Sequence, residues 1–264
     1  MATAVRCGWD RVTELTEPVA LPVTEALDLL SRGELTIEAR VTTASNATLY
    51  CRVECEGIAA ACVYKPVSGE RPLWDFPDGT LAEREVAAYL VAEAAGWEQI
   101  PPTVLRSGPM GTGMVQLWIE QDDEYDIIGA INAGEEPQLQ RMALLDAVIN
   151  NSDRKVSHLL PVQASDLHDA QLHVFGVDHG VSFATENKLR TVLWQWAGDP
   201  IPDEGIDMLH RLSERLDDDL GEQLSQLLTT REVRATRRRV QRLLGRQAFP
   251  MPPTDWPAVP YPPY

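Results

Sequence analysis

The sequence predicts an α+β protein built from two parts, a β-rich first part and a mainly helical second part. Apolar and polar residues alternate between residues 35 and 63, which is the pattern of an antiparallel sheet. Residues 203 to about 246 instead predict helices. An acidic stretch at residues 120–126 separates the two patterns. We therefore expect residues 1–120 to form one lobe and residues 121–248 to form another.

The first part is expected to contain two helices and five strands. Residues 24–30 predict a short helix with Thr24 as its N-cap, and three strands follow between residues 35 and 64. A second helix is expected over residues 81–95, because Gly79 or Thr80 can cap its start and Gly96 can end it. Residues 103–106 and 114–119 predict two further strands.

The second part begins with a helix over residues 136–150, followed by a hairpin between two acidic turns. Residues 203–246 predict the helical remainder. Residues 249–264 contain so many prolines that neither a regular helix nor a central strand can form. We expect this segment to be a flexible tail, and a protein partner with an aromatic groove for Pro-rich ligands is the alternative.

Composition restricts the function classes. A net charge of −17 argues against nucleic acid as the main partner and against adhesion to an anionic membrane. The four cysteines have no C-x-x-C spacing, which predicts reduced thiols in a cytoplasmic protein. No apolar run reaches transmembrane length, and the N-terminus does not have a signal-peptide pattern. Abundant Ala, with Arg used in place of Lys, indicates a GC-rich bacterial genome.

Two acidic residues lie in polar turns beside apolar segments. Asp153 belongs to an N-x-D-R run, and Asp178 belongs to a D-x-G run. Phosphoryl transfer uses two such carboxylates, one to orient an acceptor hydroxyl and one to hold a metal ion on the nucleotide phosphates. Taken singly, each Asp could equally be a turn former.

Lys65 ends the third predicted strand, and the helix after it carries Glu85. A strand Lys paired with a helix Glu is the arrangement by which kinases fix the Lys on nucleotide phosphates. Helical spacing places Glu85 on the apolar face of its helix, whereas Glu83 is expected to face solvent. The alternative for Lys65 is a surface Lys at a strand end.

These motifs, in this order, resemble the phosphatidylinositol 3-/4-kinase-like superfamily and the HipA-type bacterial kinases that share its core. The resemblance spans roughly residues 35–183 and rests on Val63-Tyr64-Lys65-Pro66, Asp153-Arg154 and Val177-Asp178-His179-Gly180. It implies a two-lobed protein-kinase-like fold with an antiparallel β N-lobe and a mainly helical C-lobe. It also implies an ATP-dependent phosphotransferase that acts on an unidentified hydroxyl-bearing acceptor.

The resemblance also implies roles for individual residues. Asp153 would be the catalytic Asp, Lys155 would add positive charge near the transferred phosphate, and Asp178 with His158 would hold Mg²⁺ or Mn²⁺. Residues 115–118 would be the strand that enters the hinge between the lobes, and the main chain around residues 118–120 would meet the adenine. The turn at residues 42–46 would cover the phosphates. The residues that would bind ATP are Lys65, Glu85, Gln116, Trp118, Ile119 and Ser45.

His158 is the main departure from the superfamily pattern, which usually has Asn five residues after the catalytic Asp. Imidazole is a softer ligand than an amide oxygen and suits Mn²⁺ better than Mg²⁺. The turn at residues 42–46 contains no Gly, which is closer to lipid-kinase-like loops than to protein kinases. Two alternatives therefore stay open, a nucleotide-binding pseudokinase that acts as an interaction module and a nucleotidyl (AMP) transferase.

Overall fold

A computed structural model describes residues 21–41, 46–163 and 172–264. The described chain divides into two compact units. The first unit contains the described residues up to Val86 together with Pro101–Gln121, and the second contains Ala87–Ile100 with Asp122–Tyr264. No helix in the described ranges is long and apolar enough to cross a bilayer.

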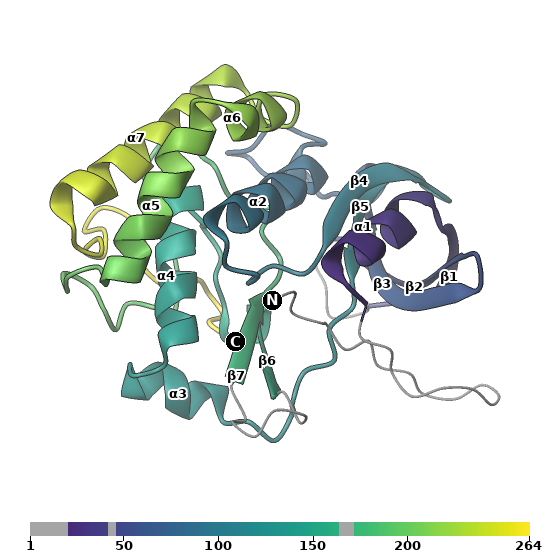
Figure 1. Cartoon of the computed structure of the whole chain (residues 1–264), viewed down its shortest axis with the longest axis horizontal. Helices are drawn as coiled ribbons and strands as arrows, with labels where there is room; N and C mark the ends of the chain where they lie inside the picture. Colours follow the sequence, from purple (N-terminus) through teal and green to yellow (C-terminus); the bar gives the residue numbers. More distant parts are fainter. Residues whose placement is uncertain (1–20, 42–45, 164–171) are drawn as a thin grey trace. The chain divides into compact units, whose positions relative to one another are not determined.

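A five-stranded antiparallel sheet forms the first unit, with the strand order β1-β2-β3-β5-β4 (Figure 1). Its strands are β1 (Glu34–Arg40), β2 (Leu49–Cys55), β3 (Ile58–Pro66), β4 (Thr103–Gly108) and β5 (Gly111–Leu117). Helix α1 (Val23–Arg32) begins one residue before the predicted N-cap, Thr24, and Pro22 takes that position. The end of α1 is tied to β4, because Arg106 Nη1 donates to the carbonyls of Leu30 and Gly33 at 2.9 and 2.7 Å.

Helix α2 (Leu81–Ala95) has the predicted bounds but a different cap. The main-chain N–H groups of Leu81 and Ala82 donate to the two carboxylate oxygens of Glu70, at 3.1 and 2.9 Å. A carboxylate satisfies two unpaired donors at once and complements the helix dipole. The predicted Thr80 does hold the N-cap position, since its carbonyl accepts from the N–H of Arg84, but Glu70, a loop residue eleven positions before Leu81, supplies the capping oxygens. Gly96, with φ of +75°, ends the helix as predicted.

Helices dominate the second unit. They are α3 (Ile127–Ala133), α4 (Pro137–Ile149), α5 (Asp203–Leu216), α6 (Asp219–Leu224) and α7 (Thr230–Arg246). The predicted hairpin is present as β6 (Leu159–Gln163) paired antiparallel with β7 (Leu172–Gly176). The sequence interpretation missed α3, because its seven residues are too few to show helical periodicity. The predicted stretch 203–246 is three helices, and a capping box of Thr229 and Glu232 starts the last one.

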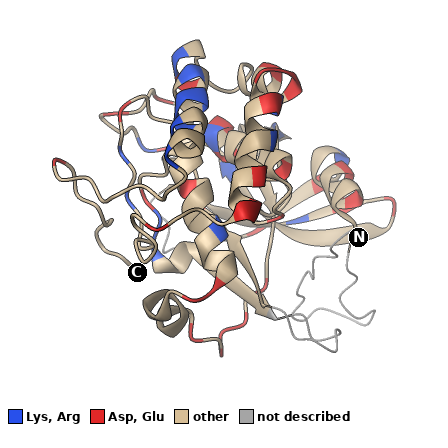
Figure 2. Ribbon diagram, turned by 60° about the vertical axis from the view of Figure 1, so that its left-hand side comes forward, with Lys and Arg blue, Asp and Glu red and all other residues tan. Residues whose placement is uncertain are grey.

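Charge is distributed unevenly among these helices. Basic residues crowd α7, whereas acidic residues are frequent on α5 and α6 (Figure 2). Arg237 is paired with Asp217 at 3.2 Å. By contrast, Arg238 and Arg242 are exposed and have no ion-pair partner within the described part of the chain.

Carbonyls of the Pro-rich C-terminal segment, which its composition predicts to be a flexible tail, accept hydrogen bonds from other parts of the second unit. The carbonyl of Ala258 accepts from the N–H of Thr191 at 3.0 Å, and the carbonyl of Pro263 accepts from the N–H of Val156 at 2.9 Å. Proline removes donors but keeps every carbonyl, so such a segment can still be fixed as a row of acceptors.

Candidate active site

Lys65 and Glu85 form the ion pair that their spacing predicts. Lys65 lies at the end of β3 and Glu85 in the second turn of α2, with Nζ and Oε1 2.6 Å apart. The Glu85 side chain is 2% exposed and that of Lys65 18% exposed. A buried carboxylate has a strong need for a cation, so Glu85 fixes the Lys65 ammonium in one position.

The other residues assigned to nucleotide binding have partners inside the first unit. Gln116 Nε2 donates to Thr103 Oγ1 at 2.8 Å, so this side chain braces β5 against β4. The N–H of Trp118 donates to the carbonyl of Ala61 at 3.1 Å, and Ile119 is buried. Ser45 lies outside the described residues.

The loop that carries Asp153 begins where α4 ends. Asn150 closes the helix in the left-handed conformation, with φ of 57°. Asn151 Nδ2 donates to Asp146 Oδ1 at 3.0 Å, and Asn151 Oδ1 accepts from the N–H of Asp153 at 3.0 Å. The turn-forming residues before Asp153 thus set its backbone position, while its carboxylate stays partly exposed.

Two cations flank the Asp153 carboxylate. Lys155 Nζ lies 2.9 Å from Oδ2, and Arg190 Nη2 lies 3.9 Å from Oδ1. The sequence predicted positive charge from Lys155. The approach of Arg190 to Asp153 was not predicted, because it depends on how the segment after Asp178 folds back onto the loop of Asp153.

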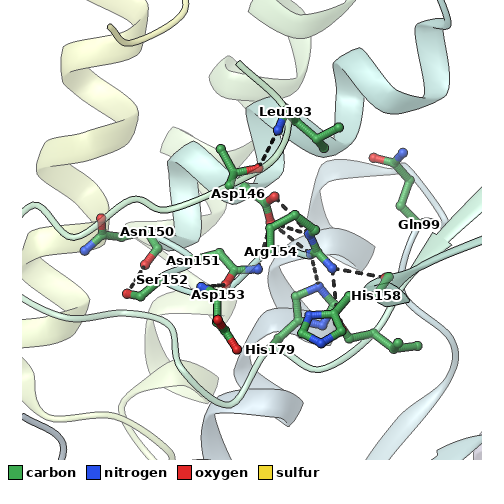
Figure 3. A network of polar contacts seen from close by, with 12 residues as sticks. Gln99, Asp146, Asn150, Asn151, Ser152, Asp153, Arg154, His158, His179 and Leu193 are labelled. Carbon is green, nitrogen blue, oxygen red and sulfur yellow. Dashed lines mark hydrogen bonds and ion pairs between the residues drawn. The ribbon is translucent and has the colours of Figure 1, made fainter. Parts of the chain in front are cut away.

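A fully buried guanidinium joins the two acidic motifs (Figure 3). Arg154 and Asp146 are both 0% exposed, and Arg154 Nη2 and Nε donate to the Asp146 carboxylate at 2.9 and 3.0 Å. Arg154 Nη1 donates to the carbonyls of His158 and Val177, at 3.2 and 3.0 Å. Its Nη2 also lies 2.7 Å from His179 Nε2, which places Arg154 in contact with residues on both sides of Asp178.

Asp146 is a residue of this network that the sequence interpretation missed. It is the lone charged residue in the apolar run of residues 142–149. A buried carboxylate is stable only with a partner, so an acid in such a run signals a buried cation elsewhere in the chain.

His158 and Asp178 come together across the two loops, with Nε2 and Oδ2 3.4 Å apart. Burial lowers the pKa of His158, which favours the neutral imidazole that a metal ion requires. Asp178 adopts a left-handed conformation with φ of 62°. No group of three or more His, Cys, Asp or Glu residues that could hold a metal occurs in the described ranges. Two protein ligands nevertheless fit Mg²⁺ or Mn²⁺, because phosphate oxygens and water complete such sites.

Two curated proteins show sequence similarity to the chain. Protein Rv2133c of Mycobacterium tuberculosis is 41% identical in an alignment 268 positions long, which includes 87% of this chain and 94% of that protein. Phosphatidylinositol 4-kinase gamma 4 of Oryza sativa subsp. japonica is 24% identical in an alignment 188 positions long, which includes 59% of this chain and 32% of that protein. No protein-family model matches the chain.

Solved kinase structures share the fold. The Golgi casein kinase with Mn/ADP bound has a TM-score of 0.60 and 13% identity, over 85% of this chain and 75% of that one. Hydra Fam20 gives 0.57 and 14%, over 85% and 87% of the two chains. The Helicobacter pylori proinflammatory kinase CtkA gives 0.54 and 11%, over 83% and 94%. The chain therefore has the predicted α+β, two-lobed protein-kinase-like fold.

Proposed function

The chain belongs to the same family as Protein Rv2133c of Mycobacterium tuberculosis, and we propose that this family member is an ATP-dependent phosphotransferase. The observation that carries the proposal is the Arg154 network. It fixes the loop of Asp153 and the two loops that present His158 and Asp178 through one buried group. The Lys65–Glu85 pair supplies the phosphate-binding cation in the other unit.

Each group has one role in the proposed reaction. Lys65, held by Glu85, binds the nucleotide phosphates, and the carboxylate of Asp153 accepts the proton of the acceptor hydroxyl. The acceptor oxygen forms its bond to the γ-phosphorus as the bond to the β–γ bridging oxygen breaks, and ADP leaves. A divalent ion held by His158 and Asp178 would neutralise phosphate charge during this transfer.

We further propose that the chain lies within the phosphatidylinositol 3-/4-kinase-like superfamily. Support comes from the match to the rice phosphatidylinositol 4-kinase and from the absence of Gly in the sequence of residues 42–46. The matched stretch is about a third of the rice protein's length, so its substrate is not carried over.

Asp153→Asn tests the reaction. The change removes the general base and keeps the shape of the side chain, so ATP turnover should fall by about 10²- to 10⁴-fold with ATP affinity retained. Turnover is measured as product formation from ATP with Mg²⁺ and with Mn²⁺. Asp217→Asn is the matched control, because Asp217 is an exposed acid of the same unit that is paired with Arg237. Unchanged turnover in Asp153→Asn would refute the assignment.

A second function is a nucleotide-binding interaction module that does not transfer phosphate. It has support from His158, which stands where the superfamily usually has the amide of Asn. ATP binding with no turnover at either metal would establish it. Mass spectrometry of the products separates an added phosphoryl group from an added AMP, and so also tests nucleotidyl transfer.

A further inference from the structure

The loop that follows β3 in the first unit contacts the chain just before β2. The N–H of Arg71 in this loop donates to Asn46 Oδ1 at 2.9 Å, and the carbonyl of Gly69 accepts from the N–H of Ala47 at 3.1 Å. Asn46 is the last residue of the segment that is expected from the sequence to cover the nucleotide phosphates. The two hydrogen bonds therefore tie the loop to the end of that segment.

The approach at Gly69 is too close for a side chain. A Cβ placed on Gly69 would overlap with the Cβ of Ala47. The Cα of Ala47 and the Cγ of Pro66 would each lie 3.5 Å from it, which is ordinary van der Waals contact. The overlap is thus confined to one methyl group, and the absence of a Cβ at position 69 allows the two backbones to meet.

Glu70, which lies between Gly69 and Arg71, holds the start of α2. Its two carboxylate oxygens accept from the N–H groups of Leu81 and Ala82, at 3.1 and 2.9 Å. Glu85 follows Leu81 by four positions, about one helical turn, so it lies within reach of any disturbance at the helix start. A first turn whose N–H groups have no acceptor frays, and Glu85 would then lose its fixed position.

The loop is fastened to α2 at a second place. The Arg84 guanidinium lies over the ring of Phe76, with Cζ 4.9 Å from the ring centroid. Phe76 is 6% exposed and Arg84 is 2% exposed. Since Arg84 precedes Glu85 directly, the loop packs against the part of α2 that carries the partner of Lys65.

We propose that Glu70 is a positioning residue for the Lys65 ammonium, and that its loop couples this cation to the segment expected to cover the phosphates. Glu70 acts through the first turn of α2 on Glu85, whose Oε1 holds Lys65 Nζ at 2.6 Å. The proposal rests on the proposed function, since that function makes Lys65 the phosphate-binding cation. One loop then places both phosphate-binding parts of the first unit relative to each other.

Calorimetry with a non-hydrolysable ATP analogue and Mn²⁺ measures the effect on the full chain. Glu70→Ala should weaken analogue binding by about 3- to 10-fold, which corresponds to the loss of a helix cap. Glu70→Gln keeps one acceptor oxygen and should weaken it less. Thr229→Ala is the matched control, because it removes the side-chain cap of α7 in the second unit. It should lower the melting temperature in a similar way and leave analogue affinity unchanged.

A double-mutant cycle separates positioning from a general effect on folding. In the Glu85→Ala background, Glu70→Ala should change affinity by less than about twofold, because the group through which Glu70 acts is already missing. Effects of the two substitutions that multiply in full would overturn the proposal. Wild-type affinity in Glu70→Ala, together with a lowered melting temperature, would show a cap that serves folding alone and would overturn it too.

Moving one methyl group tests the coupling through the loop. Gly69→Ala introduces the overlapping methyl and should weaken analogue binding at least about threefold. Gly69→Ala/Ala47→Gly removes the methyl that it meets, so affinity should return to within about twofold of wild type. Ala47→Gly alone is the control and should bind like wild type. Wild-type affinity in Gly69→Ala, or no recovery in the double variant, would refute the coupling.

The positioning role and the proposed function fail separately. Wild-type affinity in Lys65→Met would remove Lys65 from phosphate binding and would contradict the proposed function. Weakened binding in Lys65→Met with wild-type affinity in Glu70→Ala would overturn only the role of Glu70.

Discussion

Asp146→Asn is the perturbation that most directly tests the network holding the proposed catalytic loop. Asp146 and Arg154 are both 0% exposed, so the variant leaves a guanidinium buried without its counter-charge. Breaking a buried pair from one side costs about 3–5 kcal/mol of unfolding free energy. At about 2–4 °C per kcal/mol for a chain of this size, the melting temperature should fall by about 6–20 °C.

The control is Asp219→Asn, which makes the same change in a surface pair. Arg215 and Asp219 are 2.6 Å apart, but their side chains are 41% and 46% exposed. Solvent screening makes such pairs weak, so no resolvable change in melting temperature is expected. Thermal unfolding followed by circular dichroism compares the variants, and urea unfolding checks that the m-value is unchanged. Equal melting temperatures for the two variants would refute the assignment of Asp146 as a buried counter-ion.

The double variant Asp146→Leu/Arg154→Met separates stability from geometry. Replacing a buried ion pair with apolar side chains of similar size is often neutral or stabilising, so unfolding free energy should recover relative to Asp146→Asn. Turnover should not recover, because the carbonyls of His158 and Val177 lose the donor that positions them. Recovery of both quantities would show that Arg154 contributes only to folding.

Three further outcomes follow from the site and the sheet. Lys65→Met should weaken ATP binding by about 10- to 150-fold, the range expected for a charge-assisted hydrogen bond, and Glu85→Gln should weaken it less. Calorimetry with an ATP analogue measures both affinities. Unchanged affinity in Lys65→Met would show that Lys65 does not bind the nucleotide. His158→Asn replaces imidazole with an amide oxygen and should raise the ratio of Mg²⁺- to Mn²⁺-supported turnover, whereas an unchanged ratio would mean that His158 is not a ligand. Burial raises the pKa of Cys51 to about 11, above the value of 9.0 for a free thiol. The folded state therefore holds this proton more tightly than the unfolded state does, so stability should fall as pH rises from about 9 to 11. Cys51→Ala should remove the part of this stability loss that the Cys51 thiol causes, measured as melting temperature against pH. A pH profile identical to that of the wild type would refute the attribution of the loss to Cys51.

The sequence pattern predicted those elements of the fold that depend on residues close together in the chain. The strand alternation of the first unit, the bounds of α2 and the hairpin β6–β7 all follow from side-chain period and turn residues. The ion pair of Lys65 with Glu85 was also predictable, because the strand and the helix that carry these residues are neighbours in sequence.

The rest depends on contacts between distant residues, which periodicity does not encode. Glu70 caps α2 from a loop, and Arg190 reaches Asp153 from a segment 37 residues later, as their numbers show. The C-terminal segment is the clearest case, since its composition indicates disorder. Its carbonyls accept hydrogen bonds from Val156 and Thr191, and those donors cannot be identified from the Pro-rich sequence itself.

The buried position of Arg154 bears on whether the chain catalyses or only binds. Burying an ion pair contributes little net stability, because desolvation offsets the Coulomb attraction. What this pair does contribute is geometry, since a single guanidinium fixes the carbonyl of His158, the carbonyl that precedes Asp178, and the loop next to Asp153. Nucleotide binding through Lys65 and Glu85 in the first unit requires none of these contacts. This network sets the spacing between the proposed general base and the two proposed metal ligands. Such a spacing matters for a reaction and not for binding, so the network favours phosphoryl transfer over binding alone.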